Sequence, residues 1–432
     1  MPLTSVVPVL AGMTSPQPST VEIISELVNG EIVVEHSQDP LSPNGLAEAV
    51  SEGTRTPPLE AHSTLSSFHT IATICKDVVP GWKHIIGDGS LADAIEIKQM
   101  VEGLSNQLFR VRLNRTANAG ASFSTVLFRI YGEHVSSFYN PDHELKVFRT
   151  LSALGIGPKM MAHGPGWRIE EFHEDSAPLP VSSLQNPSTF SQIASILGKL
   201  HKVHRSPKFP ASEFDMTTSI TFSRLDEWTR EGLRALETLP NAAALRERLE
   251  IDQILPQVDI LRSILQAIAH SGMVGTDMVF CHNDAQENNI LVTPYGLRLI
   301  DFEYADFNYQ FADIGNLFNE FAIDYLYPEA PMFKATPSDY PSLAARRMFA
   351  SVYLSEYLER PVMDSPDSGA FLIDQLLDTA EIGSQVSHLL WGFWSLVRAQ
   401  QQAEGTTSFD FVEYARYRFE AFLQKSAELG WA

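Results

Sequence analysis

The sequence has little cysteine, few basic residues and no long apolar run. Cys75 and Cys281 are the only cysteines among 432 residues, which excludes a disulfide framework and a cysteine-rich zinc site. Lys and Arg number 31 against 53 Asp and Glu, giving a formal net charge of −22. Such a surface repels nucleic acid and anionic lipid headgroups and attracts small cations. No stretch of about 18 apolar residues occurs, so we predict no membrane insertion.

The first sixty residues differ in composition from the rest of the chain. They hold eight acidic residues and one basic residue, Arg55, with prolines scattered between short apolar clusters. A segment of this kind buries too little apolar surface to fold, and we predict a mostly disordered acidic extension over residues 1–68. Its apolar start contains proline and has no preceding Lys or Arg, unlike a signal peptide. With so few cysteines, a cytoplasmic location is predicted.

Residues 69–175 are predicted to form a small domain of strands with one helix. Alternation of apolar residues indicates strands near 94–101, 107–113, 125–131 and 167–172. Asn140 and Pro141 open a helix, because Asn is a favoured N-cap and Pro fits the first helical position. Asp142 and Glu144 follow in the first turn, where they face the positive end of the helix dipole.

Residues 176–432 are predicted to form a larger, mainly helical domain. Spacing of Ile, Leu and Val by three or four residues indicates helices over 191–203, 223–239 and 245–271. A compact β element interrupts the helices, with short strands at 278–281, 290–292 and 297–300. Strands followed by helices indicate an α+β fold.

The loop after the first of these short strands carries the strongest chemical signal. It contains Asp284 and Asn289, and a second aspartate, Asp301, ends a later strand. Two aspartates that emerge from neighbouring strands suit phosphoryl transfer from a nucleotide. Asp284 would accept the proton of an attacking hydroxyl, while Asn289 and Asp301 would hold Mg²⁺ through oxygen ligands. The alternative is a set of loop-capping residues, and His282 is interpreted as a loop brace.

Two features nearer the N-terminus are weaker signals. The loop at residues 102–106 offers backbone N–H groups to phosphates, although an ordinary hairpin turn has a similar composition. Arg129 lies inside an apolar strand, where a side chain that extends to solvent is the usual explanation. A pair between Arg129 and Glu144 would instead position nucleotide phosphates.

Acidic and aromatic residues in the last third of the chain indicate a site for the acceptor molecule. Glu320 and Tyr325 follow the second aspartate, and Trp391 and Trp394 lie three residues apart on one helix face. Aromatic rings beside a carboxylate form a box that attracts an alkylated ammonium group. The same spacing is also typical of ordinary core packing, and on spacing alone both interpretations stay open. Two downstream rings would supply further walls, Phe409 and Tyr414.

Several motifs taken together resemble the choline/ethanolamine kinase family. They are Phe280–Leu291, Leu299–Tyr309 and Asp313–Asn316, with further matches at Gly103–Asn106, Val126–Gly132, Gly155–Pro158 and Trp391–Ser395. The first motif is shared with aminoglycoside phosphotransferases, whereas the second is much more specific. The likeness runs from about Ala94 to the C-terminus, and the first ninety residues match nothing in the family.

The resemblance implies a bilobal, protein-kinase-like α+β fold with a small antiparallel β N-lobe and a large helical C-lobe. It implies transfer of the γ-phosphate of ATP, with Mg²⁺, to the hydroxyl of choline or ethanolamine. The phosphocholine formed would enter phosphatidylcholine synthesis by the CDP-choline route. The family often forms homodimers, although nothing in the composition of this chain indicates one.

The resemblance also assigns roles to individual residues. The nucleotide site comprises Gly103, Ser105, Asn106, Gln107, Arg129 and Glu144, with Glu171 and His173 in the hinge that holds adenine. Asp284 is the catalytic aspartate with Asn289 beside it, and Gln286 and Asp301 bind the nucleotide's metal ion. The amine pocket comprises Glu320, Tyr325, Trp391, Trp394, Phe409 and Tyr414. Asn288 replaces a common glycine, which we expect to be tolerated because Asn accepts a left-handed backbone.

Choline is the expected substrate, because aromatic rings around a single carboxylate suit a cation without N–H groups. The alternatives are an ethanolamine kinase and a phosphotransferase for another hydroxyl substrate, such as an aminoglycoside. A further alternative is a binding module with a kinase fold and no turnover. The intact set of Asp284, Asn289 and Asp301 argues against this last alternative.

Overall fold

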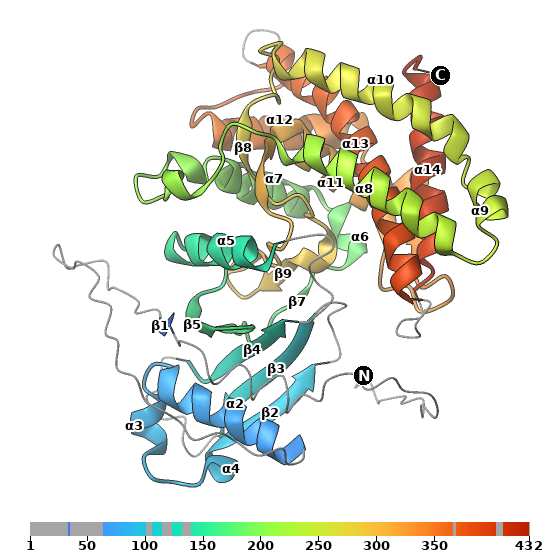
Figure 1. The fold of residues 1–432 in the computed structure, drawn as a ribbon. Helices are drawn as coiled ribbons and strands as arrows, with labels where there is room; N and C mark the ends of the chain where they lie inside the picture. Colours follow the sequence, from blue (N-terminus) through green and yellow to red (C-terminus); the bar gives the residue numbers. More distant parts are fainter. Residues whose placement is uncertain are drawn as a thin grey trace. The chain divides into compact units, whose positions relative to one another are not determined.

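The computed structural model describes residues 33–34, 64–100, 106–114, 123–131, 140–365, 369–402 and 409–431. The chain divides into two compact units (Figure 1). The smaller unit comprises Met1–Val135 and Pro158–Glu174, and the larger unit comprises Ser136–Gly157 and Asp175–Ala432. The predicted helix at Asn140 therefore belongs to the larger unit.

The smaller unit contains a six-stranded antiparallel sheet with the strand order β1-β5-β6-β4-β3-β2. Its strands are β1 (Val33–Val34), β2 (Ile95–Met100), β3 (Asn106–Leu113), β4 (Thr125–Tyr131), β5 (Met160–Gly164) and β6 (Trp167–Glu171). Alternate residues of β3, Phe109, Val111 and Leu113, are buried, as the sequence pattern predicts.

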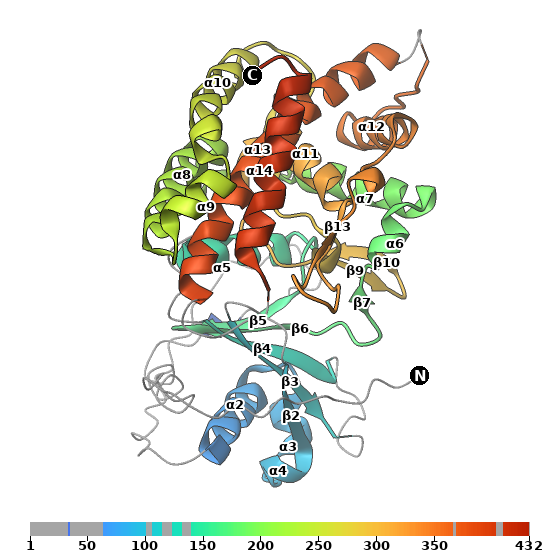
Figure 2. The same ribbon diagram turned by 90° about the vertical axis from the view of Figure 1, so that its right-hand side faces the viewer.

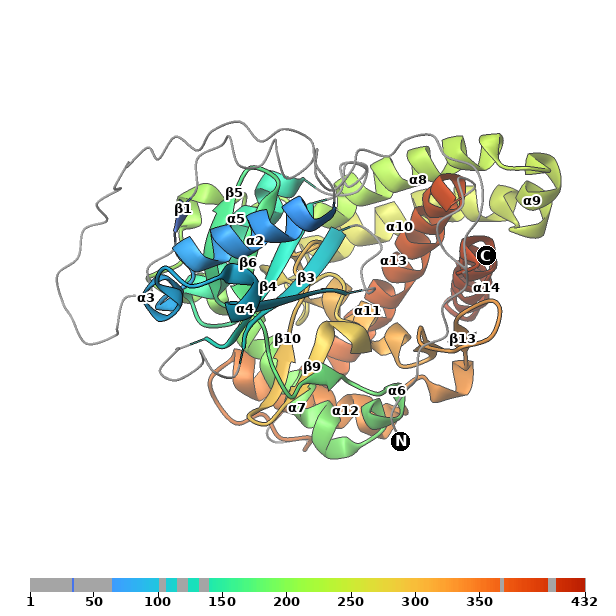
Figure 3. The ribbon, with the colours of Figure 1, turned by 90° about the horizontal axis from the view of Figure 1, so that it is seen from below.

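Three helices accompany this sheet, α2 (Thr64–Val78), α3 (Trp82–Ile86) and α4 (Leu91–Ala94). Helix α2 lies along the sheet in Figure 3, and Ile71 and Cys75 of this helix share a core with Phe109 and Ile169. The predicted extension over residues 1–68 thus overlaps two ordered elements, strand β1 and the start of α2. The remaining residues of that extension lie outside the described residues.

The larger unit is built mainly from helices. They are α5 (Pro141–Ala153), α6 (Val181–Leu184), α7 (Pro187–His201), α8 (Ile220–Thr238), α9 (Ala242–Arg248), α10 (Ile251–Ala269), α11 (Gln310–Glu320), α12 (Leu343–Tyr357), α13 (Ala370–Gln402) and α14 (Phe411–Glu428). The Asn140 side chain caps α5 by accepting from the N–H groups of Asp142 and His143, as predicted. The helix predicted over 245–271 is instead two helices, because Glu250 takes a left-handed φ of 54° between α9 and α10.

The short strands of the larger unit pair differently from the prediction. Strand β8 (Met278–Cys281) pairs with β11 (Asp306–Tyr309), whereas β9 (Ile290–Thr293) lies between β10 (Gly296–Leu299) and β7 (Ala177–Pro178). Strands β12 (Ile323–Asp324) and β13 (Lys334–Ala335) form a further pair. The expectation that Asp284 and Asp301 follow neighbouring strands is therefore wrong. No strand was predicted at β11, which is the strand that pairs with β8.

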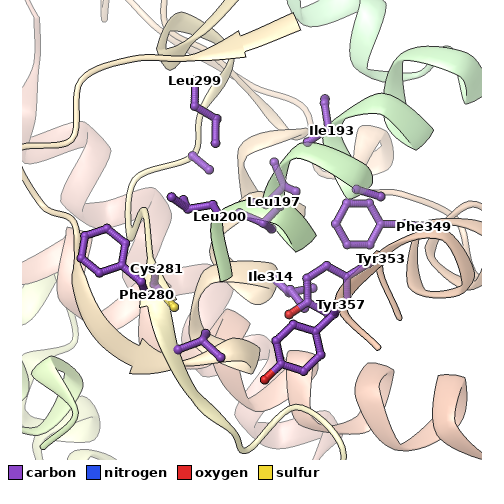
Figure 4. Close-up of a cluster of buried hydrophobic side chains, with 14 of the residues drawn as sticks. Ile193, Leu197, Leu200, Phe280, Cys281, Leu299, Ile314, Phe349, Tyr353 and Tyr357 are labelled. Atoms are coloured by element: carbon purple, nitrogen blue, oxygen red, sulfur yellow. The ribbon is translucent and has the colours of Figure 1, made fainter. Parts of the chain in front are cut away.

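The core of the larger unit has two parts. In one part, Leu197 of α7, Phe280 of β8 and Ile314 of α11 pack with Tyr353 of α12 (Figure 4). The other part joins α8, α10, α13 and α14, and Figure 2 shows α13 and α14 side by side. Helices α11 and α13 approach so closely that a Cβ atom at Gly315 or Gly383 would overlap the backbone of the facing helix. This contact fixes the position of α11, the helix that follows β11.

None of the described helices, including the 33-residue α13, is both long and apolar enough to cross a membrane.

Candidate active site

In the loop after β8, the predicted site residues Asp284 and Asn289 are hydrogen-bonded to each other. The Asn289 side-chain amide donates to the Asp284 main-chain oxygen and to its Oδ2 atom, both at 2.9 Å. The main-chain N–H of Ile300 donates to the Asn289 carbonyl, which ties the loop to the segment before Asp301. The Asp284 carboxylate is thus held in one orientation, as a proton acceptor requires.

The surroundings of Asp284 raise the proton affinity of its carboxylate. Burial, followed by the negative charges of Glu320, Glu303 and Asp301, raises the pKa of the Asp284 carboxyl well above its usual range. A hydrogen bond from the Gln286 side chain acts in the opposite direction. A carboxylate with a raised pKa is a stronger proton acceptor than an ordinary surface aspartate.

A buried carboxylate, Asp313, braces the start of this loop. Asp313 accepts the main-chain N–H of His282 and that of Asn283, each at 2.8 Å. It also lies 2.9 Å from Nε2 of His201. Asn283 has a left-handed φ of 63°, and the two bonds to Asp313 help to hold this turn. From the sequence, Asp313 was recognised only as the first residue of the motif Asp313–Asn316, and no role was predicted for it.

His282 is a structural residue, as the sequence interpretation proposed. Its side chain is fully buried, and Nε2 lies 2.9 Å from the carbonyl oxygen of Ile300. Burial lowers the pKa of His282 below its usual value. His282 therefore braces the loop to the segment that leads to Asp301.

Asp301 has the properties of a metal ligand. It has a left-handed φ of 60°, and its buried Oδ1 atom has no hydrogen-bond partner among the described residues. A carboxylate oxygen that is buried without a donor is expensive to keep unless a cation binds it. Together with the side-chain oxygens of Gln286 and Asn289, Asp301 would supply the hard oxygen donors that Mg²⁺ prefers.

Two residues of the same loop, Asn288 and Glu287, were not anticipated in their observed form. Asn288 is not left-handed; it lies in a single turn of 3₁₀-helix formed by Glu287–Asn289. Glu287 is 1% exposed, and burial with the nearby charge of Glu320 raises its pKa to about 8. The sequence analysis assigned no role to Glu287.

One further cluster of side chains has the composition of a metal site. His201, Cys281 and Asp313 are buried with their possible ligand atoms within 4.8 Å of one another. His201 is bonded to Asp313 on one side and lies 2.7 Å from the Tyr353 hydroxyl on the other. The cluster therefore belongs to the loop brace.

The predicted acceptor residues Glu320, Tyr325 and Tyr414 form one hydrogen-bonded group. The Tyr325 hydroxyl donates to Oε2 of Glu320 at 2.6 Å and lies 2.5 Å from the Tyr414 hydroxyl. The group also contains Arg418, which the sequence analysis missed: its Nη2 lies 2.5 Å from Oε1 of Glu320. Arg418 is completely buried, so the predicted single carboxylate is paired.

The predicted aromatic residues lie in the same core. The Phe409 ring is 5.6 Å from that of Tyr414 and 4.8 Å from that of Phe411, which in turn lies 5.7 Å from Trp394. The Trp391 and Trp394 rings are 5.3 Å apart and nearly perpendicular. Phe411 thus connects the two tryptophans with the tyrosines, a role that spacing did not indicate.

Two other polar groups hold the tryptophans in place. The indole N–H of Trp391 donates to Oδ1 of Asn316 at 2.8 Å, and that of Trp394 donates to the Tyr304 hydroxyl at 3.1 Å. Both partners come from motifs that carried the family resemblance, but neither had been assigned to the amine pocket.

The predicted nucleotide residues of the smaller unit are only partly described. Gly103 and Ser105 lie outside the described residues, whereas Asn106 and Gln107 begin β3 opposite Tyr131 and Ile130 of β4. The Arg129 side chain is buried rather than extended to solvent, and its Nε donates to Glu170 at 3.2 Å.

The remaining predicted nucleotide residues lie at the end of β6 and in α5. Glu171 ends β6, and one of its oxygens lies 3.9 Å from Nδ1 of His173. Glu144 is buried in the first turn of α5 in the larger unit. The Arg129–Glu144 pair stays a prediction, and Glu170 is the Arg129 partner that sequence reasoning missed.

The chain is similar to several known proteins. A family model described as choline/ethanolamine kinase matches residues 97–423. The choline/ethanolamine kinase of Rattus norvegicus is 30% identical over 334 residues, which is 76% of this chain and 79% of the relative.

Solved structures agree with the fold. The choline kinase from Cryptosporidium parvum Iowa II is 34% identical with a TM-score of 0.72, over 84% of this chain and 96% of that one. The Plasmodium vivax ethanolamine kinase has a TM-score of 0.61 at 22% identity, over 83% of this chain and 90% of that one, and so shares the fold. The predicted protein-kinase-like α+β fold is confirmed.

Proposed function

Because this chain belongs to the choline/ethanolamine kinase family, we propose that it transfers the γ-phosphate of ATP to the hydroxyl oxygen of choline. The chain is a kinase, so a nucleotide is its phosphoryl donor and a small amino alcohol its acceptor. Its product, phosphocholine, would enter phosphatidylcholine synthesis by the CDP-choline route. The single observation that carries this proposal is the fixed Asp284–Asn289 pair with Asp301.

Asp284 is the proton acceptor in this proposal. The Asn289 amide orients its carboxylate, and burial with neighbouring negative charge raises its pKa. Both effects favour removal of the proton from the choline hydroxyl as its oxygen attacks phosphorus. The loop brace at Asp313 and His282 keeps this carboxylate in place during the transfer.

Asp301 and Gln286, with Asn289, are proposed to hold Mg²⁺. The bound metal would neutralise charge on the β- and γ-phosphates. In the smaller unit, the residues proposed for the nucleotide are Asn106, Gln107, Arg129, Glu171 and His173, with Gly103 and Ser105 in the preceding loop.

The aromatic groups around Glu320 are proposed to bind the ammonium end of the substrate. Ethanolamine loses three hydrogen bonds to water when its ammonium group enters an aromatic pocket, and it needs acceptors in return. The trimethylammonium group of choline has no N–H to satisfy and gains apolar and cation–π contacts. We therefore propose that choline is preferred and that ethanolamine is a poorer substrate.

The test is ATP consumption by the purified protein with choline, ethanolamine and an aminoglycoside in parallel, with and without Mg²⁺. Choline should give the highest kcat/KM, and removal of Mg²⁺ should abolish turnover. A preference for ethanolamine would overturn the amine assignment. A preference for the aminoglycoside would overturn the substrate class, and a lack of turnover with every acceptor would indicate a non-catalytic binding module.

Replacing either tryptophan tests the aromatic part of the proposal. Trp391→Ala or Trp394→Ala should raise KM for choline about tenfold, because one desolvated cation–π contact is worth about 1–2 kcal/mol. KM for ethanolamine should change less. Trp431→Ala, which removes an indole outside the proposed pocket, is the control. Equal effects on both amines would mean that these rings are ordinary core.

A further inference from the structure

Arg418 connects all three polar groups of the proposed amine site. Its Nη2 approaches Oε1 of Glu320 at 2.5 Å, the Tyr414 hydroxyl at 2.6 Å and the Tyr325 hydroxyl at 3.1 Å. Its Nε also donates to the Tyr414 hydroxyl, at 2.9 Å. Arg418 and Glu320 are 0% and 2% exposed, so the positive charge of one is balanced by the negative charge of the other.

The hydrogens of this group can be assigned by counting. The single hydroxyl hydrogen of Tyr325 is donated to Glu320. The 2.5 Å contact between the two hydroxyls must therefore use the hydrogen of Tyr414, with Tyr325 as acceptor. The Tyr414 oxygen accepts twice from Arg418, and the Tyr325 oxygen accepts from Tyr414. Because Nη2 of Arg418 has two hydrogens for three acceptors, its 3.1 Å contact with the Tyr325 oxygen shares a hydrogen with one of the shorter bonds.

The count leaves few acceptors for an incoming ammonium group. A hydroxyl oxygen has two lone pairs, so the Tyr414 oxygen is fully used, whereas the second lone pair of Tyr325 receives only the shared Nη2 hydrogen. Each Glu320 oxygen accepts one hydrogen bond and keeps one further acceptor position. On Glu320, Tyr325 and Tyr414, the three N–H donors of a primary ammonium group would find two free positions and one, on Tyr325, that is weakly occupied. A trimethylammonium group needs none.

We propose that Arg418 is the positioning residue that sets amine specificity, by occupying the acceptors of Glu320, Tyr325 and Tyr414 that a primary ammonium group would need. This inference rests on the proposed function. Arg418 does not touch the substrate in this proposal; it acts through the three residues that line the site. The pocket then selects a quaternary ammonium group because its attraction comes from aromatic rings rather than from free acceptors.

The experiment compares kcat/KM for choline and for ethanolamine in the full-length protein and three variants. Arg418→Met frees acceptor positions on all three partners, so the choline-to-ethanolamine ratio should fall about tenfold, with most of the change in KM. Arg418→Lys keeps one charge and part of the hydrogen bonding, and should restore part of the ratio. Arg416→Met removes an arginine of the same helix whose partners are the surface residues Glu413 and Glu420, and should leave the ratio unchanged.

Two results would overturn the inference. If Arg418→Met lowers kcat/KM for both amines by the same factor, Arg418 has a purely structural role, although the proposed function stands. If the wild-type protein phosphorylates neither amine, the proposed function fails, and the inference fails with it. The wild-type measurement therefore separates the two failures.

A second variant covers the case in which Arg418→Met does not fold, since removing one partner of a buried ion pair is strongly destabilising. Tyr325→Phe keeps the ring but removes the hydrogen bond to Oε2 of Glu320, without leaving a charge unpaired. It should lower the same ratio by a smaller factor, about threefold. An unchanged ratio in a folded Tyr325→Phe protein would contradict the proposal by itself.

Discussion

At the scale of single residues, the candidate site depends on how buried charges are paired. Asp313 is stabilised by hydrogen bonds to His201 and two main-chain groups, and Glu320 by Arg418. Asp284 accepts from the side-chain amide of Asn289, whereas Oδ1 of Asp301 has no donor among the described residues. The carboxylates with strong donors are held in one position by them. Asp284 and Asp301, with weak or missing donors, are the ones proposed for proton transfer and metal binding.

Asp284→Asn should keep nucleotide binding and lose nearly all turnover. The substitution preserves side-chain volume but removes the proton acceptor, and general-base catalysis contributes about 10²- to 10⁴-fold. Single-turnover phosphorylation of choline measures the loss, and ADP titration measures binding. Near-native turnover with intact binding would remove Asp284 from the reaction.

Asp301→Asn should weaken the binding of ADP in the presence of Mg²⁺ by about tenfold or more and leave metal-free binding unchanged. Asn is preferred to Ala for this test because Asn tolerates the left-handed φ of 60° at this position. Calorimetric titration with and without Mg²⁺ distinguishes the two effects. If the variant keeps the full metal dependence, another residue must hold the ion.

At the scale of secondary structure, α11 organises three parts of the larger unit. Asp313 in its first turn braces the catalytic loop, Asn316 accepts the indole N–H of Trp391, and Glu320 at its end pairs with Arg418. Residues three and four positions apart lie on the same side of a helix. A single buried face of α11 therefore contacts the catalytic loop and the proposed amine site.

Asp313→Asn should destabilise the protein by about 2–4 kcal/mol near neutral pH, because buried donors lose a charged acceptor. Burial alone would raise the pKa of Asp313, but hydrogen bonds and charge from His201 and His282 outweigh it and lower the pKa. Its stabilisation is therefore complete above the unfolded-state pKa, near 4, and is lost as the pH falls through the folded-state value.

Urea unfolding of wild type and Asp313→Asn at several pH values checks this prediction. The difference in the free energy of unfolding should be largest between about pH 6 and 8 and should narrow below about pH 4. Asp252→Asn, which removes a surface partner of Arg246, should show a small difference at every pH. A pH-independent difference for Asp313→Asn would mean that its charge does not stabilise the loop.

At the scale of the whole molecule, the part of the chain that contains the proposed site residues and the cores of both units begins at α2. The family model matches residues 97–423, and the core of the smaller unit begins with residues of α2. The first sixty residues contribute one described element, the two-residue strand β1 at the edge of the sheet. The net charge of −22 is compatible with the cationic acceptor and does not identify it.

Deleting residues 1–60 should leave choline phosphorylation within about twofold of the full-length value. It should lower the melting temperature by less than about 4 °C, since the deletion keeps all of α2 and, of the described contacts between strands, removes the two pairings of β1. Differential scanning calorimetry and the amine assay measure both quantities. A larger loss of stability would show that the extension packs on the folded chain.

Local patterns in the sequence predicted much of the fold. Alternation located β3, β4 and β6, and the Asn140–Pro141 signal located the start of α5. These features depend on residues that are close in the sequence, so the sequence pattern alone is sufficient to predict them. The longer patterns were less reliable: periodicity alone did not reveal the break at Glu250 or the strand β11, because each depends on the backbone conformation or pairing of one short segment.

The sequence by itself determined the polar pair of the proposed catalytic loop, because Asp284 and Asn289 are five positions apart and their side chains bond to each other. Only the tertiary structure decided how the buried charges are paired. Arg418 and Glu320 are separated by 98 positions in the sequence, and Asp313 and His282 are separated by 31 positions. Helical periodicity predicts that such residues face inward, but it does not specify which residue of another helix they meet. The pairing depends on helix packing, and here that packing converted an expected free carboxylate into a neutral, hydrogen-bonded pair.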